Sequence, residues 1–144
     1  MPYEFTTTRR VEFAETDMAG LVHFAGYFRY MEETEHAFFR SLGFSVVLWK
    51  QFKVGLPRVH ASCDYTGPLH FEDEVEIRLR VREKKEKSLS YDFLFRRVKP
   101  QPAVEVARGR ITVVCVTRDE AGTMRSVPIP EPIARLIEVA PAGA

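Results

Sequence analysis

The sequence predicts an α+β domain in which one long helix packs on an antiparallel sheet. Apolar side chains recur every three or four positions between residues 24 and 42, which is the spacing of one buried face of an α-helix. Apolar and charged side chains then alternate through residues 75–82, and a second alternation follows at 89–95. Such alternation indicates strands with one buried face, so we expect the helix to lie against that face.

The first half of the chain is expected to form a strand, a loop and then the helix. Residues 3–13 mix apolar side chains with threonine and arginine, which is typical of a half-exposed strand. Residues 15–23 show no clear period and are predicted to form a loop. Gly43 directly follows the helical pattern over 24–42 and is suited to end the helix. Residues 46–56 are ambiguous, with a short helix as one option.

The second half is expected to supply most of the sheet. Strands are predicted at residues 59–65, 75–82, 89–95 and 103–117. The charged run 84–87 separates two of them and is interpreted as the turn of an antiparallel hairpin. A short helix is expected within 133–139, and residues 140–144 are expected to form a frayed tail. Residues 1–139 are therefore predicted to form a single domain.

Composition narrows the classes of function. The chain has 144 residues, 45% of them hydrophobic, and 21 basic and 20 acidic residues give a net charge of +1. This mixture is typical of a globular domain, whereas a nucleic-acid-binding protein usually carries a basic excess. No apolar run approaches the roughly 20 residues needed to cross a bilayer, and the first residues lack the apolar region of a signal peptide. The two cysteines are far apart in the sequence and have no metal-type spacing. We therefore expect a reduced, cytoplasmic protein without nucleic acid, membrane insertion or a bound metal.

The segment before the helix holds the strongest candidate for chemistry. Asp17 places a carboxylate on a loop, and the first amides of the following helix, near His23 and Phe24, have no partners within the helix. A carbonyl oxygen on those amides would be polarised as in an oxyanion hole, and Asp17 could act on that carbonyl as a general base or nucleophile. The alternative is that Asp17 only forms a turn or caps the helix. His23 has two options as well, namely a polar contact to substrate or a hydrogen-bonded place at the helix start.

The same segment resembles the signature of the 4-hydroxybenzoyl-CoA thioesterase family. The resemblance rests on Val11-Glu12-Phe13, on Thr16-Asp17-Met18-Ala19-Gly20-Leu21-Val22, and on Tyr27 and Glu32. It implies the hot-dog fold, in which a curved antiparallel sheet is wrapped around one long central helix. The predicted order of elements covers nearly the whole chain and agrees with that fold.

The resemblance also implies roles for individual residues. Asp17 takes the position of the family's catalytic carboxylate, and the oxyanion donor is a backbone amide near Phe24. Gly20 would let the loop approach the thioester closely. Tyr27 and Glu32 match downstream positions of the family pattern and are expected to support the site.

Glu35 is a second acid on the predicted helix, in the middle of its apolar face. An acid in that place must find a partner or lie near a cavity. It could line a substrate pocket or contact a neighbouring subunit, or a slight rotation of the helix could let it reach solvent. The residues alone leave these options open.

Basic residues of the second half are candidates for binding coenzyme A, whose nucleotide carries phosphates. The resemblance suggests that these contacts come from the charged hairpin and from the loop before the terminal segment. The candidates are Lys85, Lys87, Ser88 and Arg125. The alternative is a solvated, charged turn.

The resulting prediction is an acyl-CoA thioesterase that releases a free acid and coenzyme A. It would need no cofactor, because coenzyme A is part of the substrate. Two alternatives stay open, namely an acyl-CoA hydratase or dehydratase of the same fold and a non-catalytic acyl-CoA-binding module. The resemblance implies a homodimer or homotetramer whose sheets pair edge to edge and whose sites are shared between chains. The acyl group is not predicted, and acyl carrier protein is an alternative thioester donor.

Overall fold

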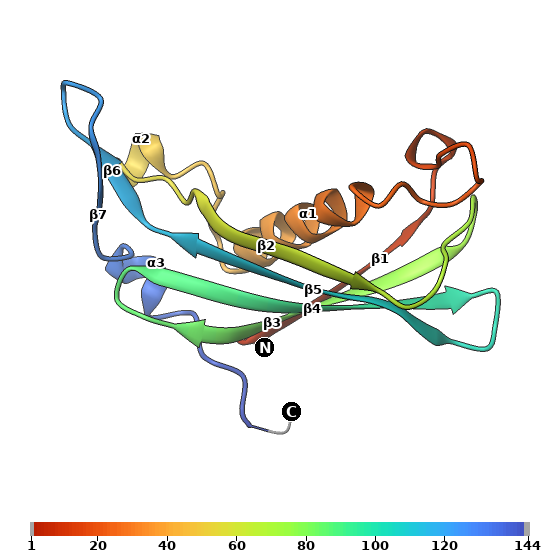
Figure 1. Ribbon diagram of the computed structural model, residues 1–144. Helices are drawn as coiled ribbons and strands as arrows, with labels where there is room; N and C mark the ends of the chain where they lie inside the picture. Colours follow the sequence, from red (N-terminus) through yellow and green to blue (C-terminus); the bar gives the residue numbers. More distant parts are fainter. Residues whose placement is uncertain (1, 143–144) are drawn as a thin grey trace.

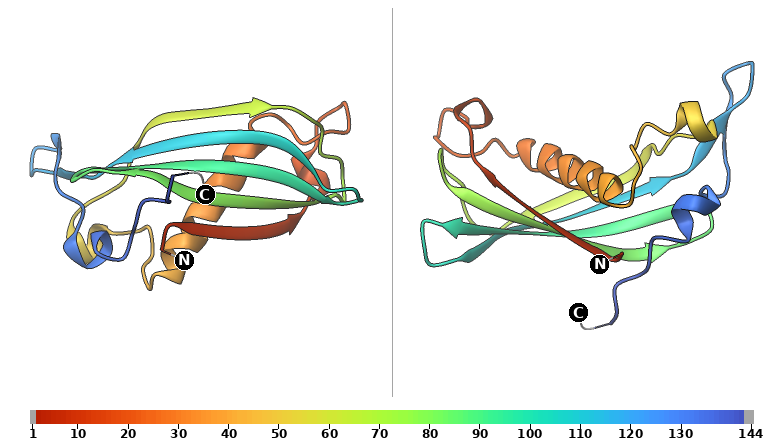
Figure 2. Two further views of the ribbon diagram at one scale, coloured as in Figure 1. Left: turned by 90° about the horizontal axis from the view of Figure 1, so that it is seen from below. Right: turned by 180° about the vertical axis from the view of Figure 1, so that it is seen from behind.

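A curved antiparallel sheet is wrapped around one long helix in the computed structural model, which describes residues 2–142 (Figure 1). The sheet has five strands in the order β1-β3-β4-β5-β2, and every neighbouring pair is antiparallel. Their bounds are Glu4–Arg10 (β1), Glu74–Lys84 (β3), Ser88–Lys99 (β4), Val104–Val114 (β5) and Arg58–Tyr65 (β2). The helix α1, Gly26–Ser41, crosses the concave face of this sheet (Figure 2). The predicted α+β arrangement is therefore confirmed.

The periodicities of the sequence explain why the helix and sheet meet. Strands β3 and β4 bury alternate side chains, and the buried face of α1 carries large side chains from Tyr27 to Phe39. Gly109 of β5 allows the close approach of the two layers. A Cβ atom there would lie 2.5 Å from the Sδ atom of Met31 and 3.2 Å from the carbonyl oxygen of Ser62.

The last long strand is shorter than predicted. β5 ends at Val114, and Val116–Arg118 (β6) pairs with Met124–Ser126 (β7) in a separate two-stranded sheet. The backbone beyond Val114 is still hydrogen-bonded to its neighbours. The amide of buried Cys115 donates to the Lys87 carbonyl (2.7 Å), and Val116 exchanges two hydrogen bonds with Gly55. The extended chain therefore continues past Val114, and β6 then takes β7 as its strand partner in place of a strand of the large sheet.

The short elements also differ in detail from the prediction. Phe13–Glu15 forms a 3-10 helix (η1) in place of the end of the first strand. The ambiguous segment contains α2, Trp49–Phe52, and the terminal helix α3 spans only Glu131–Ala134. The predicted tail begins at Ala140, whose amide donates to the Val81 carbonyl (2.8 Å), and its last two residues lie outside the described part of the chain.

Strand β2 forms one edge of the sheet. It pairs with β5 on one side only, and all of its residues except half-buried Cys63 are exposed. Its outer row of backbone groups is therefore free to pair with another strand. None of the helices between residues 2 and 142 is long and apolar enough to cross a membrane.

Candidate active site

Asp17 begins a tight five-residue turn that connects η1 to the start of α1. The Asp17 amide donates to the Leu21 carbonyl (2.8 Å), and the Gly20 amide donates to the Asp17 carbonyl (2.9 Å). Gly20 has a φ angle of +80°, a left-handed conformation that favours glycine. The predicted need for glycine at this position therefore has a backbone cause within the turn itself.

The two oxygens of the Asp17 carboxylate have different environments. Its Oδ1 atom accepts hydrogen bonds from the amides of Ala19 (2.9 Å) and Leu21 (3.3 Å), which is the turn-forming role that stood as the alternative. Its Oδ2 atom has no hydrogen-bond partner among the residues that the structure describes, and the side chain is exposed. One carboxylate oxygen therefore shapes the turn, and the other is free for a ligand.

The turn at residues 119–123 has the same pattern of hydrogen bonds as the Asp17 turn. The Asp119 amide donates to the Thr123 carbonyl (3.1 Å), the Gly122 amide donates to the Asp119 carbonyl (3.0 Å), and the Thr123 amide donates to Asp119 Oδ1 (2.9 Å). Gly122 has a φ angle of +85°. This turn connects β6 to β7, so the aspartate turn by itself is a structural unit. Any chemistry at Asp17 must come from what surrounds it.

The two backbone amides predicted to form an oxyanion hole differ. The His23 amide donates to the Glu15 carbonyl (2.9 Å), which corrects the expectation that both amides are free. The Phe24 amide has no partner within residues 2–142. The helix begins two residues later than predicted, at Gly26, which leaves Phe24 in the turn before it. The candidate oxyanion donor is therefore the Phe24 amide alone.

The side chains around Phe24 order the start of α1. The His23 ring accepts a hydrogen bond from the Ala25 amide at Nδ1 (3.2 Å) and stacks on the Phe24 ring at 4.6 Å, so His23 takes the helix-start role. The Tyr65 hydroxyl of β2 donates to the Phe24 carbonyl (2.7 Å). Buried Tyr27 packs edge-on against Tyr65 at 4.9 Å, and burial raises the Tyr27 pKa to about 12. These contacts fasten the residue that carries the free amide.

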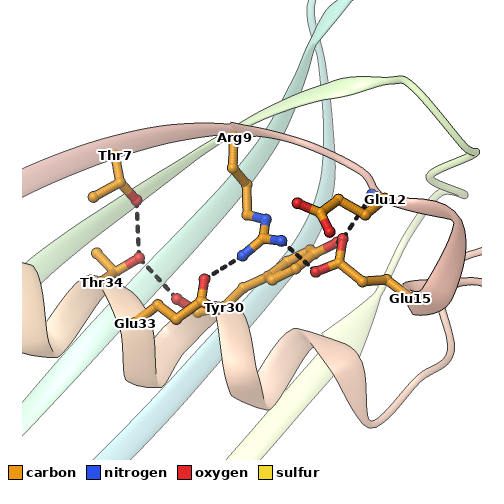
Figure 3. Close-up of polar contacts among 7 residues, drawn as sticks. All are labelled: Thr7, Arg9, Glu12, Glu15, Tyr30, Glu33 and Thr34. Carbon is orange, nitrogen blue, oxygen red and sulfur yellow. Dashed lines mark hydrogen bonds and ion pairs between the residues drawn. The ribbon is translucent and has the colours of Figure 1, made fainter.

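Glu15 links the Asp17 turn to both layers of the fold (Figure 3). Its carboxylate pairs with Arg9 of β1 and accepts hydrogen bonds from the Tyr30 hydroxyl of α1 (2.8 Å) and the Glu12 amide (2.8 Å). Arg9 also pairs with Glu33, and its guanidinium lies 4.5 Å from the centre of the Tyr30 ring. Sequence reasoning missed Glu15 and Arg9, although an acid two residues before Asp17 was a visible signal.

An apolar hollow lies beside the Asp17 carboxylate. Its volume is about 540 Å³, and it is lined by Phe13, Thr16, Asp17, Met18, Gly20 and Phe71. The Phe13 and Phe71 rings meet edge-on at 5.8 Å and are both exposed, as is Met18. Sequence reasoning used Phe13 and Met18 only as part of the family pattern, and it did not consider Phe71. Their proximity depends on the turn before β3, which is distant in the sequence.

The two helix acids differ in environment. Glu35 is only 1% exposed and binds Arg58 of β2, with Oε1 2.6 Å from Nη2 and Oε2 3.3 Å from Nη1. Its partner is therefore an arginine of the same chain, and Glu35 does not reach solvent. Glu32 is exposed and lies 3.9 Å from the same guanidinium. Neither acid has a recorded contact with Asp17 in the described chain, so a supporting role for Glu32 stays a prediction.

The predicted coenzyme A residues lie at the other end of the sheet. Lys85 and Lys87 are in the turn between β3 and β4, Ser88 begins β4, and Arg125 is in β7. Figure 1 shows this end opposite the Asp17 turn. Lys85 lies 3.5 Å from Glu83, and both side chains are exposed. One chain therefore does not bring these residues to Asp17. Within residues 2–142, no three His, Cys, Asp or Glu side chains are grouped as metal ligands.

Comparison with known proteins decides the family. Residues 11–137 match the thioesterase-like superfamily. The chain belongs to this family. The match confirms the predicted thioesterase family with its hot-dog fold, and it confirms the expectation of an enzyme of the thioesterase class.

Three relatives illustrate the likeness. A 1,4-dihydroxy-2-naphthoyl-CoA hydrolase from Synechococcus sp. (strain CC9311) is 28% identical over 143 residues, covering 94% of this chain and 90% of that protein. The crystal structure of a 1,4-dihydroxy-2-naphthoyl-CoA thioesterase from Synechocystis superposes with a TM-score of 0.84 at 27% identity, covering 93% of this chain and 95% of that one. An Aquifex aeolicus (strain VF5) protein whose name places it among the esterases is 40% identical over 72 residues, which span half of this chain and 56% of that relative.

Proposed function

We propose that this thioesterase-family protein hydrolyses an aromatic acyl-CoA thioester to the free acid and coenzyme A. The observation that carries the proposal is a short loop with the Asp17 Oδ2 atom at one end and the Phe24 amide at the other, neither of which has a hydrogen-bond partner within residues 2–142. Thioester hydrolysis needs a nucleophile or general base and a donor to the developing oxyanion, and a carboxylate and a backbone amide can supply them.

The reaction follows from these two groups. The Phe24 amide would donate to the thioester oxygen and stabilise the negative charge that develops there. Asp17 would either attack the carbonyl carbon, giving an anhydride that water then cleaves, or take a proton from the attacking water. In both cases the carbon–sulfur bond breaks and coenzyme A leaves as the thiol. Each group is expected to contribute about 10²–10³-fold to the rate.

The proposed acyl group is aromatic for two reasons. The hollow beside Asp17 has walls from Phe13, Phe71 and Met18, and edge-on aromatic packing of that kind suits a planar ring. Two of the relatives described above act on 1,4-dihydroxy-2-naphthoyl-CoA by name, which is an aromatic thioester.

We also propose that the complete site needs two chains. The free outer edge of β2 is suited to pair with the same edge of a second copy. In one chain, Lys85, Lys87, Ser88 and Arg125 lie far along the sheet from Asp17. A second copy in antiparallel orientation would bring its own basic end toward the Asp17 turn. A homodimer or homotetramer would therefore bind the nucleotide of coenzyme A with residues of one chain and the acyl group with the other.

The test is thiol release from a panel of acyl-CoA thioesters. The panel contains benzoyl, 4-hydroxybenzoyl, 1,4-dihydroxy-2-naphthoyl, acetyl, hexanoyl and palmitoyl groups, with one acyl-carrier-protein thioester to compare the two donors. The aromatic members are expected to be cleaved fastest. Asp17→Asn keeps an Oδ1 atom for the Ala19 and Leu21 amides and should lower kcat by at least about 100-fold.

The matched control is Asp119→Asn, because that residue occupies the same turn at the other end of the protein. It should leave kcat unchanged within about twofold, since no reacting group lies there. An Asp17→Asn variant that is as active as the Asp119→Asn variant would remove Asp17 from the mechanism. A wild-type protein that cleaves no thioester of the panel would refute the proposed activity.

A further inference from the structure

The Asp17 turn has an external anchor that the Asp119 turn lacks. Glu15 stands at the start of the loop, and its carboxylate binds Arg9 and Tyr30. Its carbonyl accepts a hydrogen bond from the His23 amide (2.9 Å), which lies at the end of the loop. The hydrogen bonds recorded for the 119–123 turn come from its own residues, as far as the described chain shows. A turn of this kind therefore forms without an anchor, and the anchor at Glu15 has a different use.

The anchor fixes the turn to both layers of the fold at once. Arg9 belongs to β1 at the edge of the sheet, and Tyr30 lies one turn into α1. Both reach the same carboxylate, and the Arg9 guanidinium also covers the Tyr30 ring at 4.5 Å (Figure 3). Burial raises the pKa of the Tyr30 hydroxyl above its usual value, so this group stays protonated and donates to Glu15 in alkaline solution as well. A charge-assisted carboxylate with three donors is a strong and geometrically specific connection.

The two groups proposed to react lie on either side of this anchor. Asp17 is two residues after Glu15 in the chain, and Phe24 directly follows the residue whose amide Glu15 binds. A shift of Glu15 would therefore change the position of the carboxylate relative to the Phe24 amide. Misplacement of reacting groups by about 1 Å can cost roughly 100-fold in rate.

We infer that Glu15, held by Arg9 and Tyr30, is a positioning residue. It fixes the position of the Asp17 carboxylate relative to the Phe24 amide for thioester hydrolysis. The inference rests on the proposed function. Glu15 does not line the hollow beside Asp17, and its carboxylate is occupied by Arg9, Tyr30 and the Glu12 amide, so we expect it to touch neither the acyl group nor coenzyme A. Its loss should therefore lower kcat and leave KM nearly unchanged.

The experiment compares Glu15→Gln with Glu33→Gln. Glu33 pairs with the other side of the same arginine, but it lies on the exposed face of α1 and has no bond to the loop. Glu15→Gln should lower kcat about tenfold with KM within about twofold of wild type. Glu33→Gln should stay within about twofold of wild type in both constants. Tyr30→Phe removes a single hydroxyl from Glu15 and should lower kcat by about threefold.

A double-mutant cycle separates positioning from general stability. Once Asp17→Asn has removed the reacting carboxylate, adding Glu15→Gln should lower the residual kcat by less than about threefold. A full tenfold loss in that background would refute the inference, and so would a Glu15→Gln kcat equal to that of Glu33→Gln. If Glu15→Gln fails to fold by circular dichroism, Tyr30→Phe takes its place in the cycle, and an unchanged kcat there refutes the inference. The wild-type and Asp17→Asn rates test the proposed function separately.

Discussion

Replacing Arg58 with methionine should destabilise the protein because it leaves Glu35 without its partner. Glu35 is 1% exposed, and both of its oxygens bind the Arg58 guanidinium, at 2.6 and 3.3 Å. Tyr91 is fully buried beside them, and its pKa is raised mainly by burial and further by Glu35. No other cation is recorded within ion-pair distance of Glu35 in the described chain. In Arg58→Met, the carboxylate therefore stays buried without an opposite charge.

The size of the effect follows from burial. Removing one partner of a buried ion pair costs about 3–5 kcal/mol. The Arg58 side chain is 30% exposed, so water partly compensates, and we expect about 3 kcal/mol. Methionine keeps most of the apolar stem, which limits any loss of packing. In a chain of this size the melting temperature should fall by roughly 6–12 °C.

Urea denaturation and thermal melting at one protein concentration measure this change. Arg96→Met is the control, because Arg96 and Glu76 form a more exposed pair at 3.4 Å, and its loss should cost less than about 1 kcal/mol. The double variant Glu35→Gln with Arg58→Met should recover most of the stability, since it removes the unpaired charge. A loss in Arg58→Met no greater than in Arg96→Met would refute this reasoning.

Three further predictions concern the hollow, the helix–sheet contact and a thiol. Phe71→Ala removes a wall of the hollow and should lower kcat/KM about tenfold for aromatic thioesters but less for hexanoyl-CoA; an equal loss across the panel would contradict an acyl-binding role. Gly109→Ala places a Cβ 2.5 Å from Met31 Sδ and should cost about 1–3 kcal/mol in urea denaturation, unlike Gly55→Ala, which has open space. Burial raises the Cys63 pKa to about 11, so roughly one thiol in a thousand is ionised at pH 8. Its reaction with a disulfide reagent can be followed by peptide mapping. The reaction should be slow at pH 8 and faster toward pH 10. A fast reaction at pH 8 would contradict the raised pKa of this thiol.

Local patterns in the sequence were sufficient for the elements that form the two layers. The alternation at 75–82 and 89–95 and the helical period at 24–42 each report one buried face, and that information is contained in a few consecutive residues. The end of β5 was not predictable in this way. It depends on the change of strand partner to β7, which the pattern of residues 103–117 does not contain.

The same distinction between local and long-range information applies to the residues of the candidate site. Asp17 and Phe24 could be proposed from the sequence because they precede a predicted helix and match a family pattern. The Glu15 anchor was missed because it needs Arg9 and Tyr30 from two other elements. The short pattern Asp-x-Ala-Gly also occurs twice, at 17–20 and 119–122, and both copies form the same turn. Spacing alone therefore cannot distinguish the aspartate proposed to react from the one that only forms a turn.

The hydrogen bonds that close the 17–21 turn have a consequence for how selectivity can evolve. Its recorded hydrogen bonds are made by main-chain groups or by the Asp17 carboxylate, so the side chains of Met18 and Ala19 are not needed for its shape. Phe13 and Phe71, which form the rest of the wall, lie outside the turn. Substitutions at 13, 18 and 71 can therefore accumulate under selection for a new acyl group while the carboxylate keeps its geometry. A library randomised at these three positions is a direct route to thioesterases of altered substrate range.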